Sequence, residues 1–151
     1  HTLFAGIASK LAYEALKDGD EFTLGGTYGG GGPSLKLKAD HVYFKNDCAV
    51  TSVSNTVVII TKLRRPFHNL KDFTDLKIDL KEFKTLIVKS GYLSPELQSL
   101  SAPTFMALTS GAVNQDIKGI ENNNRLQKIY PFQDFNDYSP VVSNGEHLIN
   151  Q

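Results

Sequence analysis

Short apolar segments alternate with sequences typical of helices through the middle of this chain. Three such segments lie at 56–61, 85–88 and 104–108, and each interval between them has room for a crossover helix. A crossover helix allows successive strands to pair in parallel. The run 57–60 contains no polar residue, which is typical of a strand buried on both faces. The pattern therefore predicts an α/β fold in which these three segments are parallel strands of a mixed sheet.

Two helix starts are marked between these predicted strands. Asn69 precedes a segment with apolar residues at helical spacing, and asparagine is a good N-cap residue. Ser94 is followed by Pro95, and proline is favoured at the first position of a helix. We therefore expect short helices after Asn69 and after Ser94 to cover the sheet.

The N-terminal part predicts one helix and several antiparallel strands. Leu3, Ile7 and Leu11 recur every four residues, which predicts a helix over 3–17. Apolar residues alternate with polar ones in the region 34–53, which predicts an antiparallel strand and hairpin region. This region adds α+β character to the predicted α/β class.

The alternation within the antiparallel region gives two local predictions. It changes phase near Asp40 and His41, which indicates a bulge or a strong twist. The segments 48–53 and 56–61 predict a hairpin that turns at residues 54–55.

The length of 151 residues fits one domain. The last apolar cluster ends at Phe132. We therefore expect a single globular domain over 1–133, followed by an extended or poorly ordered tail over 134–151.

Charge and residue types exclude several functions. Sixteen basic and sixteen acidic residues give a formal charge of zero, which excludes the broad positive surface of a dedicated nucleic-acid binder. The longest apolar run, 57–60, is far shorter than the roughly 20 residues of a membrane span, so we expect no membrane partner. The four histidines lack the spacing of metal ligands, and Cys48 is the only cysteine. We expect no metal or other cofactor in this chain.

Basic and hydroxyl residues follow each of the three predicted parallel strands. Ligands of open α/β sheets bind at the carboxyl edge, where such residues converge. We call these residues the rim, and we predict that they line a site for an anion or a partner domain; they are Arg64, Arg65, Lys89, Ser90 and Ser110. The alternative is that they are ordinary solvated loop residues.

Ser90 does not lie in a sequence motif of serine hydrolases. The sequence around it, VKSGY, differs from the Gly-x-Ser-x-Gly motif, and no histidine is near it in sequence. We therefore expect no catalytic residue in this chain.

Several segments, in the same order, resemble the C-terminal domain of the MlrC family, the microcystin degradation proteins classed as M81 zinc metallopeptidases. These segments are 24–27 (LGGT), 32–37 (GPSLKL), 58–67 (VIITKLRRPF), 86–97 (LIVKSGYLSPEL), 107–117 (ALTSGAVNQDI) and 130–134 (YPFQD). The chain departs from the family pattern after Lys-Ser, where it has Gly91, Tyr92 and Leu93 in place of His-Phe-Arg. It also has Ser110 where the family has the proline of Thr-Pro-Gly. The roles of those family side chains are therefore not carried over.

The resemblance implies a part in a larger metallohydrolase. The zinc ligands of the family belong to an N-terminal catalytic domain, which we expect to be missing from this chain, as the first residue, His1, also suggests. The implied role is to dock on that domain and help form the cleft for a peptide or small anionic substrate. The isolated chain is expected to be inactive.

A second hypothesis is a stand-alone module that binds a small anionic ligand at the same rim. Under either hypothesis we expect a cytoplasmic protein.

Overall fold

The computed structural model describes residues 1–26, 32–90, 92, 94–100, 102–108 and 116–119. The chain divides into two compact units, residues 1–107 and 108–151. The described part of the second unit contains one short 3-10 helix, η2 (Ile117–Gly119). Ser110 and the predicted tail over 134–151 lie outside the described residues.

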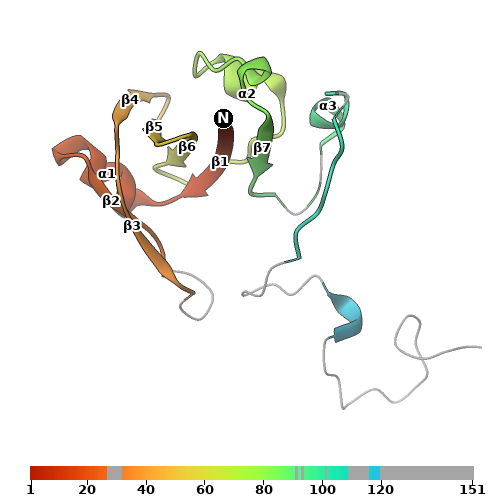
Figure 1. Cartoon of the computed structure of the whole chain (residues 1–151), viewed down its shortest axis with the longest axis horizontal. Coiled ribbons are helices and arrows are strands. Elements are labelled where there is room, and N and C mark those ends of the chain that lie inside the picture. Colours follow the sequence, from red (N-terminus) through yellow and green to blue (C-terminus); the bar gives the residue numbers. More distant parts are fainter. Residues whose placement is uncertain (27–31, 91, 93, 101, 109–115, 120–151) are drawn as a thin grey trace, which may run out of the picture. The chain divides into compact units, whose positions relative to one another are not determined.

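A mixed sheet forms the centre of the first unit (Figure 1). Within the described residues it has five strands in the order β4-β5-β6-β1-β7. These strands are β1 (Thr2–Ala8), β4 (His41–Lys45), β5 (Cys48–Val53), β6 (Thr56–Thr61) and β7 (Thr85–Val88). β1 runs parallel to both β6 and β7, whereas β4, β5 and β6 are antiparallel neighbours. The predicted α/β class with a mixed sheet is confirmed.

The predicted helix over 3–17 is wrong in its first half. Residues Thr2–Ala8 form strand β1, and helix α1 (Lys10–Asp18) begins only after Ser9, whose hydroxyl accepts a hydrogen bond from the Ala12 N–H at 3.2 Å. β1 is covered on both faces, so it has few polar residues to produce a period of two. Its apolar residues therefore match the four-residue spacing of a helix.

The predicted strand at 104–108 is also wrong. These residues are irregular and exposed, and the side chain of Phe105 is 94% accessible. β1 is the third parallel strand instead, between β6 and β7. An apolar composition favours a strand only where a partner strand and a covering layer are present.

The region 34–53 belongs to two sheets. β2 (Glu21–Gly25) and β3 (Ser34–Lys38) form a separate antiparallel pair, whereas β4 joins the main sheet. The change of phase near Asp40 is therefore a passage from one sheet to the other and not a bulge. The predicted hairpin of β5 and β6 is confirmed, with Ser54 at φ 52° in its turn.

Each face of the main sheet packs against a different set of elements. Helix α1 and strand β2 cover one face, where the buried residues are Ala12, Tyr13, Leu16, Phe22, Ala39, Ala49, Val58 and Ile60. The other face is covered by α2 (Leu70–Thr74), η1 (Leu80–Glu82), α3 (Pro95–Gln98) and the segments that connect them. The buried residues there include Leu3, Cys48, Ile59, Phe67, Phe73, Leu76 and Leu97. The helices predicted after Asn69 and Ser94 are confirmed as α2 and α3.

Candidate functional site

The carboxyl ends of β6, β1 and β7 lie at one edge of the main sheet, because the three strands are parallel. Residues 62–69 follow β6, and Lys89, Ser90 and Tyr92 follow β7. The predicted rim residues that follow β6 and β7 therefore do lie at the carboxyl edge of parallel strands. The third segment, with Ser110, lies outside the described residues.

A bulge at Gly6 brings these two segments close to the end of β1. The register of β1 against β6 shifts between Ala5 and Ile7, and Gly6 has φ +90°. A Cβ atom at Gly6 would lie 3.6 Å from the Lys89 carbonyl oxygen and 3.7 Å from the Phe67 ring. Gly6 therefore lies between the loops that follow β6 and β7, and bulges often occur next to functional sites.

Ser90 lies beside a histidine that is distant in sequence. Its Oγ is 3.3 Å from His68 Nε2, and Tyr92 Oη is 3.4 Å from His68 Nδ1. The rings of His68 and Tyr92 also contact each other, with centroids 4.9 Å apart. Both nitrogens of the imidazole therefore face a hydroxyl group.

The hydrogen bonds of this cluster define the role of Ser90. Its hydroxyl donates to the Tyr92 carbonyl oxygen at 2.7 Å, so its oxygen is left to accept from His68 Nε2–H. The Tyr92 hydroxyl lies at hydrogen-bond distance from His68 Nδ1, and the direction of that bond depends on the tautomer of His68. In a serine nucleophile the histidine must accept the serine proton, and here the proton is directed to a carbonyl. Ser90 and His68 are therefore not paired here as a serine nucleophile and its base are.

Buried Ser94 fixes the position of His68. Its hydroxyl donates to the His68 carbonyl oxygen and accepts from the Leu97 N–H at the start of α3. The loop after β6 is thus attached to the first turn of α3. Glu96 Oε2 adds a second link between α3 and α2, because it accepts the Leu70 N–H at 2.7 Å.

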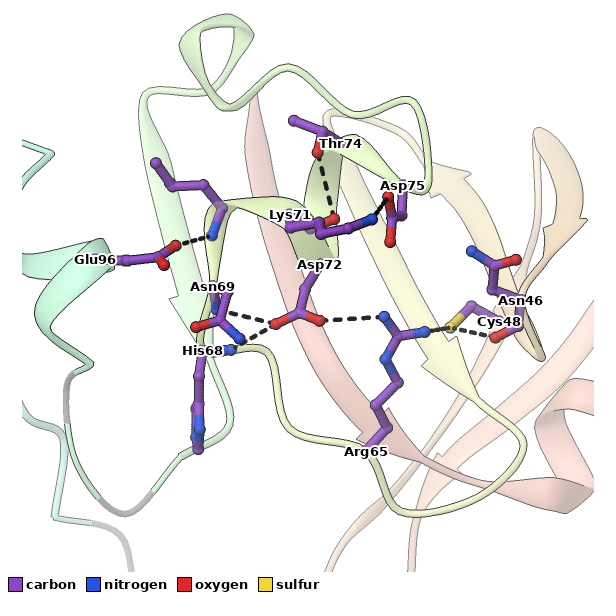
Figure 2. A network of polar contacts seen from close by, with 11 residues as sticks. Asn46, Cys48, Arg65, His68, Asn69, Lys71, Asp72, Thr74, Asp75 and Glu96 are labelled. Carbon is purple, nitrogen blue, oxygen red and sulfur yellow. Dashed lines mark hydrogen bonds and ion pairs between the residues drawn. The ribbon is translucent and has the colours of Figure 1, made fainter.

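The side chain of Arg65, one of the predicted rim residues, belongs to a network of polar contacts with Asp72 and Cys48 (Figure 2). Its guanidinium group lies 3.2 Å from Asp72 Oδ1 and 3.8 Å from Cys48 Sγ. The other carboxylate oxygen of Asp72 accepts the backbone N–H groups of His68 and Asn69 at 3.0 and 2.9 Å. Arg65 and Asp72 therefore connect strand β5, the loop after β6 and the start of α2.

These contacts shift two pKa values. Burial raises the pKa of Asp72, but the hydrogen bonds from the Asn69 N–H, the Arg65 guanidinium and the His68 N–H outweigh it, so the net shift is downward. Burial raises the pKa of the Cys48 thiol, and the nearby Arg65 charge only partly opposes this shift. Asp72 is thus a stable anion and Cys48 a neutral thiol at neutral pH.

Arg64 and Lys89 remain exposed. In the described part of the chain, neither side chain forms an ion pair. Their charges are therefore available to a ligand or a partner domain. Among the predicted rim residues, Ser90 contacts His68 and Arg65 forms an ion pair with Asp72. Arg64 and Lys89 are exposed and form no ion pair with a described residue.

Sequence reasoning missed His68 and Tyr92. His68 follows β6, as Arg64 does, so the same argument from strand ends could have included His68 in the rim. Tyr92 was a departure from the family pattern, and its contact with His68 was not visible from sequence spacing.

Within the described residues, no group of three or more His, Cys, Asp or Glu side chains is arranged to hold a metal ion. A helix of the length and apolarity needed to cross a membrane is likewise missing from the described part.

The fold and the polar edge define an α/β domain with a candidate binding rim. The sequence matches the family model "MlrC C-terminus" over residues 10–124, which is more than half of the chain. The chain therefore belongs to the MlrC C-terminal domain family. A comparison with curated proteins finds no match.

Proposed function

We propose that this chain is the accessory domain of an MlrC-like zinc metallopeptidase of the M81 family. It docks on an N-terminal catalytic domain and completes the substrate cleft with Arg64, Lys89 and Ser90. The observation that carries the proposal is the position of Arg64 and Lys89. Both follow parallel strands at one sheet edge, and neither has an acidic partner among the described residues.

The chemistry divides between the two domains. Zinc held by the catalytic domain would polarise a carbonyl group and activate water. The charges of Arg64 and Lys89 would attract a substrate carboxylate or stabilise negative charge that develops on an oxygen. The internal hydrogen bonds of the Ser90–His68–Tyr92 cluster would hold the loops after β6 and β7 in place beside these charges.

The proposal includes a peptide or small anionic substrate and a cytoplasmic location. The Cys48 thiol is free and buried, which is compatible with a reducing compartment.

Complementation tests the docking step. The catalytic domain is expressed alone, and peptide hydrolysis is measured as this chain is added. We expect saturable activation, and weaker activation by the Arg64→Ala chain. Lys81→Ala is the matched control, because Lys81 is exposed in η1, away from the carboxyl edge. Full activity of the catalytic domain alone, unchanged by this chain, would contradict the proposal.

A further inference from the structure

A cavity of about 580 Å³ lies between the β2–β3 pair and the main sheet. Its walls come from β1, β2, β3 and the β5–β6 hairpin, and they include Phe4, Ile7, Leu24, Leu37, Val53 and Val58. The volume is within the range of about 300–1,000 Å³ that is typical of small-molecule sites. Such a site favours the apolar part of a ligand.

One charged residue contributes to this cavity. Among the described residues that line it, Lys89 is the only charged one. Lys89 is exposed and has no acidic partner among the described side chains. A single ammonium group beside an apolar cavity is complementary to a ligand with an apolar body and one carboxylate.

The Ser9 hydroxyl also lines the cavity. Its oxygen accepts the Ala12 N–H at the start of α1, so its proton can be donated to the same carboxylate as Lys89. The Lys89 main chain is fixed, because its N–H donates to the Ala5 carbonyl oxygen at 3.0 Å. The backbone from which the side chain extends is therefore held by strand β1.

We propose that this cavity binds a small amphipathic carboxylate, with the apolar body inside the cavity and the carboxylate paired with Lys89. The inference goes beyond the proposed function, because this site lies within the chain and needs no catalytic domain. Its failure would leave the docking proposal intact.

A tryptophan reporter tests the site in the complete chain. The chain has no tryptophan, so Leu35→Trp places a single reporter at a largely exposed position of the cavity wall. Decanoate and decanol are the probes, since they share the apolar chain and differ in charge. We expect saturable fluorescence changes with both probes and tighter binding of decanoate.

Charge and shape are then tested separately. In the Leu35→Trp chain, the further change Lys89→Met should weaken decanoate binding about three- to fivefold, as expected for the loss of an exposed ion pair. The affinity for decanol should stay within about twofold of its value before this change. Lys84→Met, an exposed lysine at the opposite end of β7, is the control and should change neither affinity. Ala8→Leu, which adds volume at the cavity wall, should weaken both probes while the protein stays folded by circular dichroism.

Three results would overturn the proposal. They are the lack of saturable binding, equal affinities of decanoate before and after Lys89→Met, and unchanged binding of both probes to a folded Ala8→Leu variant.

Discussion

The ion pair of Arg65 and Asp72 should contribute measurably to stability, unlike the pairs on the surface. The Asp72 side chain is 19% exposed and that of Arg65 is 30% exposed. Asp72 accepts three hydrogen bonds, from Arg65, His68 and Asn69. Asp72→Ala removes all three and leaves two backbone donors without their acceptor. We expect a loss of about 2–3 kcal/mol in the free energy of unfolding, since a hydrogen bond to a charged group contributes roughly 1.5–3 kcal/mol and the losses here overlap.

Asp72→Asn separates charge from hydrogen bonding. The amide oxygen can still accept the backbone N–H groups, so the loss should be smaller, about 1–2 kcal/mol. Asp75→Asn is the matched control, because Asp75 pairs with Lys71 one turn away on the same helix surface. That exposed pair should contribute no more than about 0.5 kcal/mol.

The contribution of Asp72 to the free energy of unfolding should depend on pH in a direction that its pKa shift determines. The pKa of Asp72 is lower in the folded chain than in the unfolded chain. Its contribution is therefore fully present above the unfolded pKa of about 3.9 and is lost as the pH falls through the folded value. The difference between wild type and Asp72→Asn should be largest at neutral pH and should shrink below about pH 4.

Urea denaturation followed by far-UV circular dichroism measures these differences at pH 7 and at pH 3. The reasoning would be refuted if Asp72→Ala and Asp75→Asn lost the same stability at pH 7. A difference for Asp72→Asn that grew toward acid pH would refute it as well.

Three further predictions follow from the structure. Cys48 should react slowly with Ellman's reagent in the folded chain and at once in denaturant, because the thiol is buried and its raised pKa keeps it protonated. Gly6→Ala should cost about 1–2 kcal/mol in urea denaturation, because the φ of +90° disfavours a side chain, whereas Gly19→Ala, with open space and extended backbone, should cost less than about half of that. Arg64→Ala and Lys89→Ala should keep the thermal midpoint within about 2 °C of wild type, because neither exposed charge has an ion pair among the described residues.

The sequence was sufficient where a local pattern decides the structure. The hairpin of β5 and β6 has polar turn residues between two apolar segments, and α3 begins at a serine followed by proline. Cap and turn residues act on their immediate neighbours, so tertiary contacts rarely reverse their effect.

The sequence failed where the covering layers decide the structure. Residues 2–8 have a helical spacing of apolar side chains, yet they form strand β1, an interior strand of the sheet, because both faces are covered. Residues 104–108 have a strand-like composition but no partner strand in the described part of the chain. In both cases the deciding contacts come from residues far away in sequence.

The same distinction applies to the candidate site. The edge of the sheet could be predicted, because parallel strands place their ends together. The side-chain contacts could not be predicted. Arg65 pairs with Asp72 at the start of α2, and His68 in the loop after β6 contacts Ser90 in the loop after β7.

Turnover in a protein that joins this chain to the proposed catalytic domain tests the central claim most directly. Peptide hydrolysis is measured for wild type, Arg64→Ala, Lys89→Ala and the control Lys81→Ala, with the thermal midpoint of each. We predict that kcat/KM falls about tenfold or more for the two rim variants, equal to roughly 1.4 kcal/mol or more of lost transition-state stabilisation, with unchanged midpoints. Wild-type kcat/KM in both rim variants would contradict the account and leave this domain without a part in the substrate cleft.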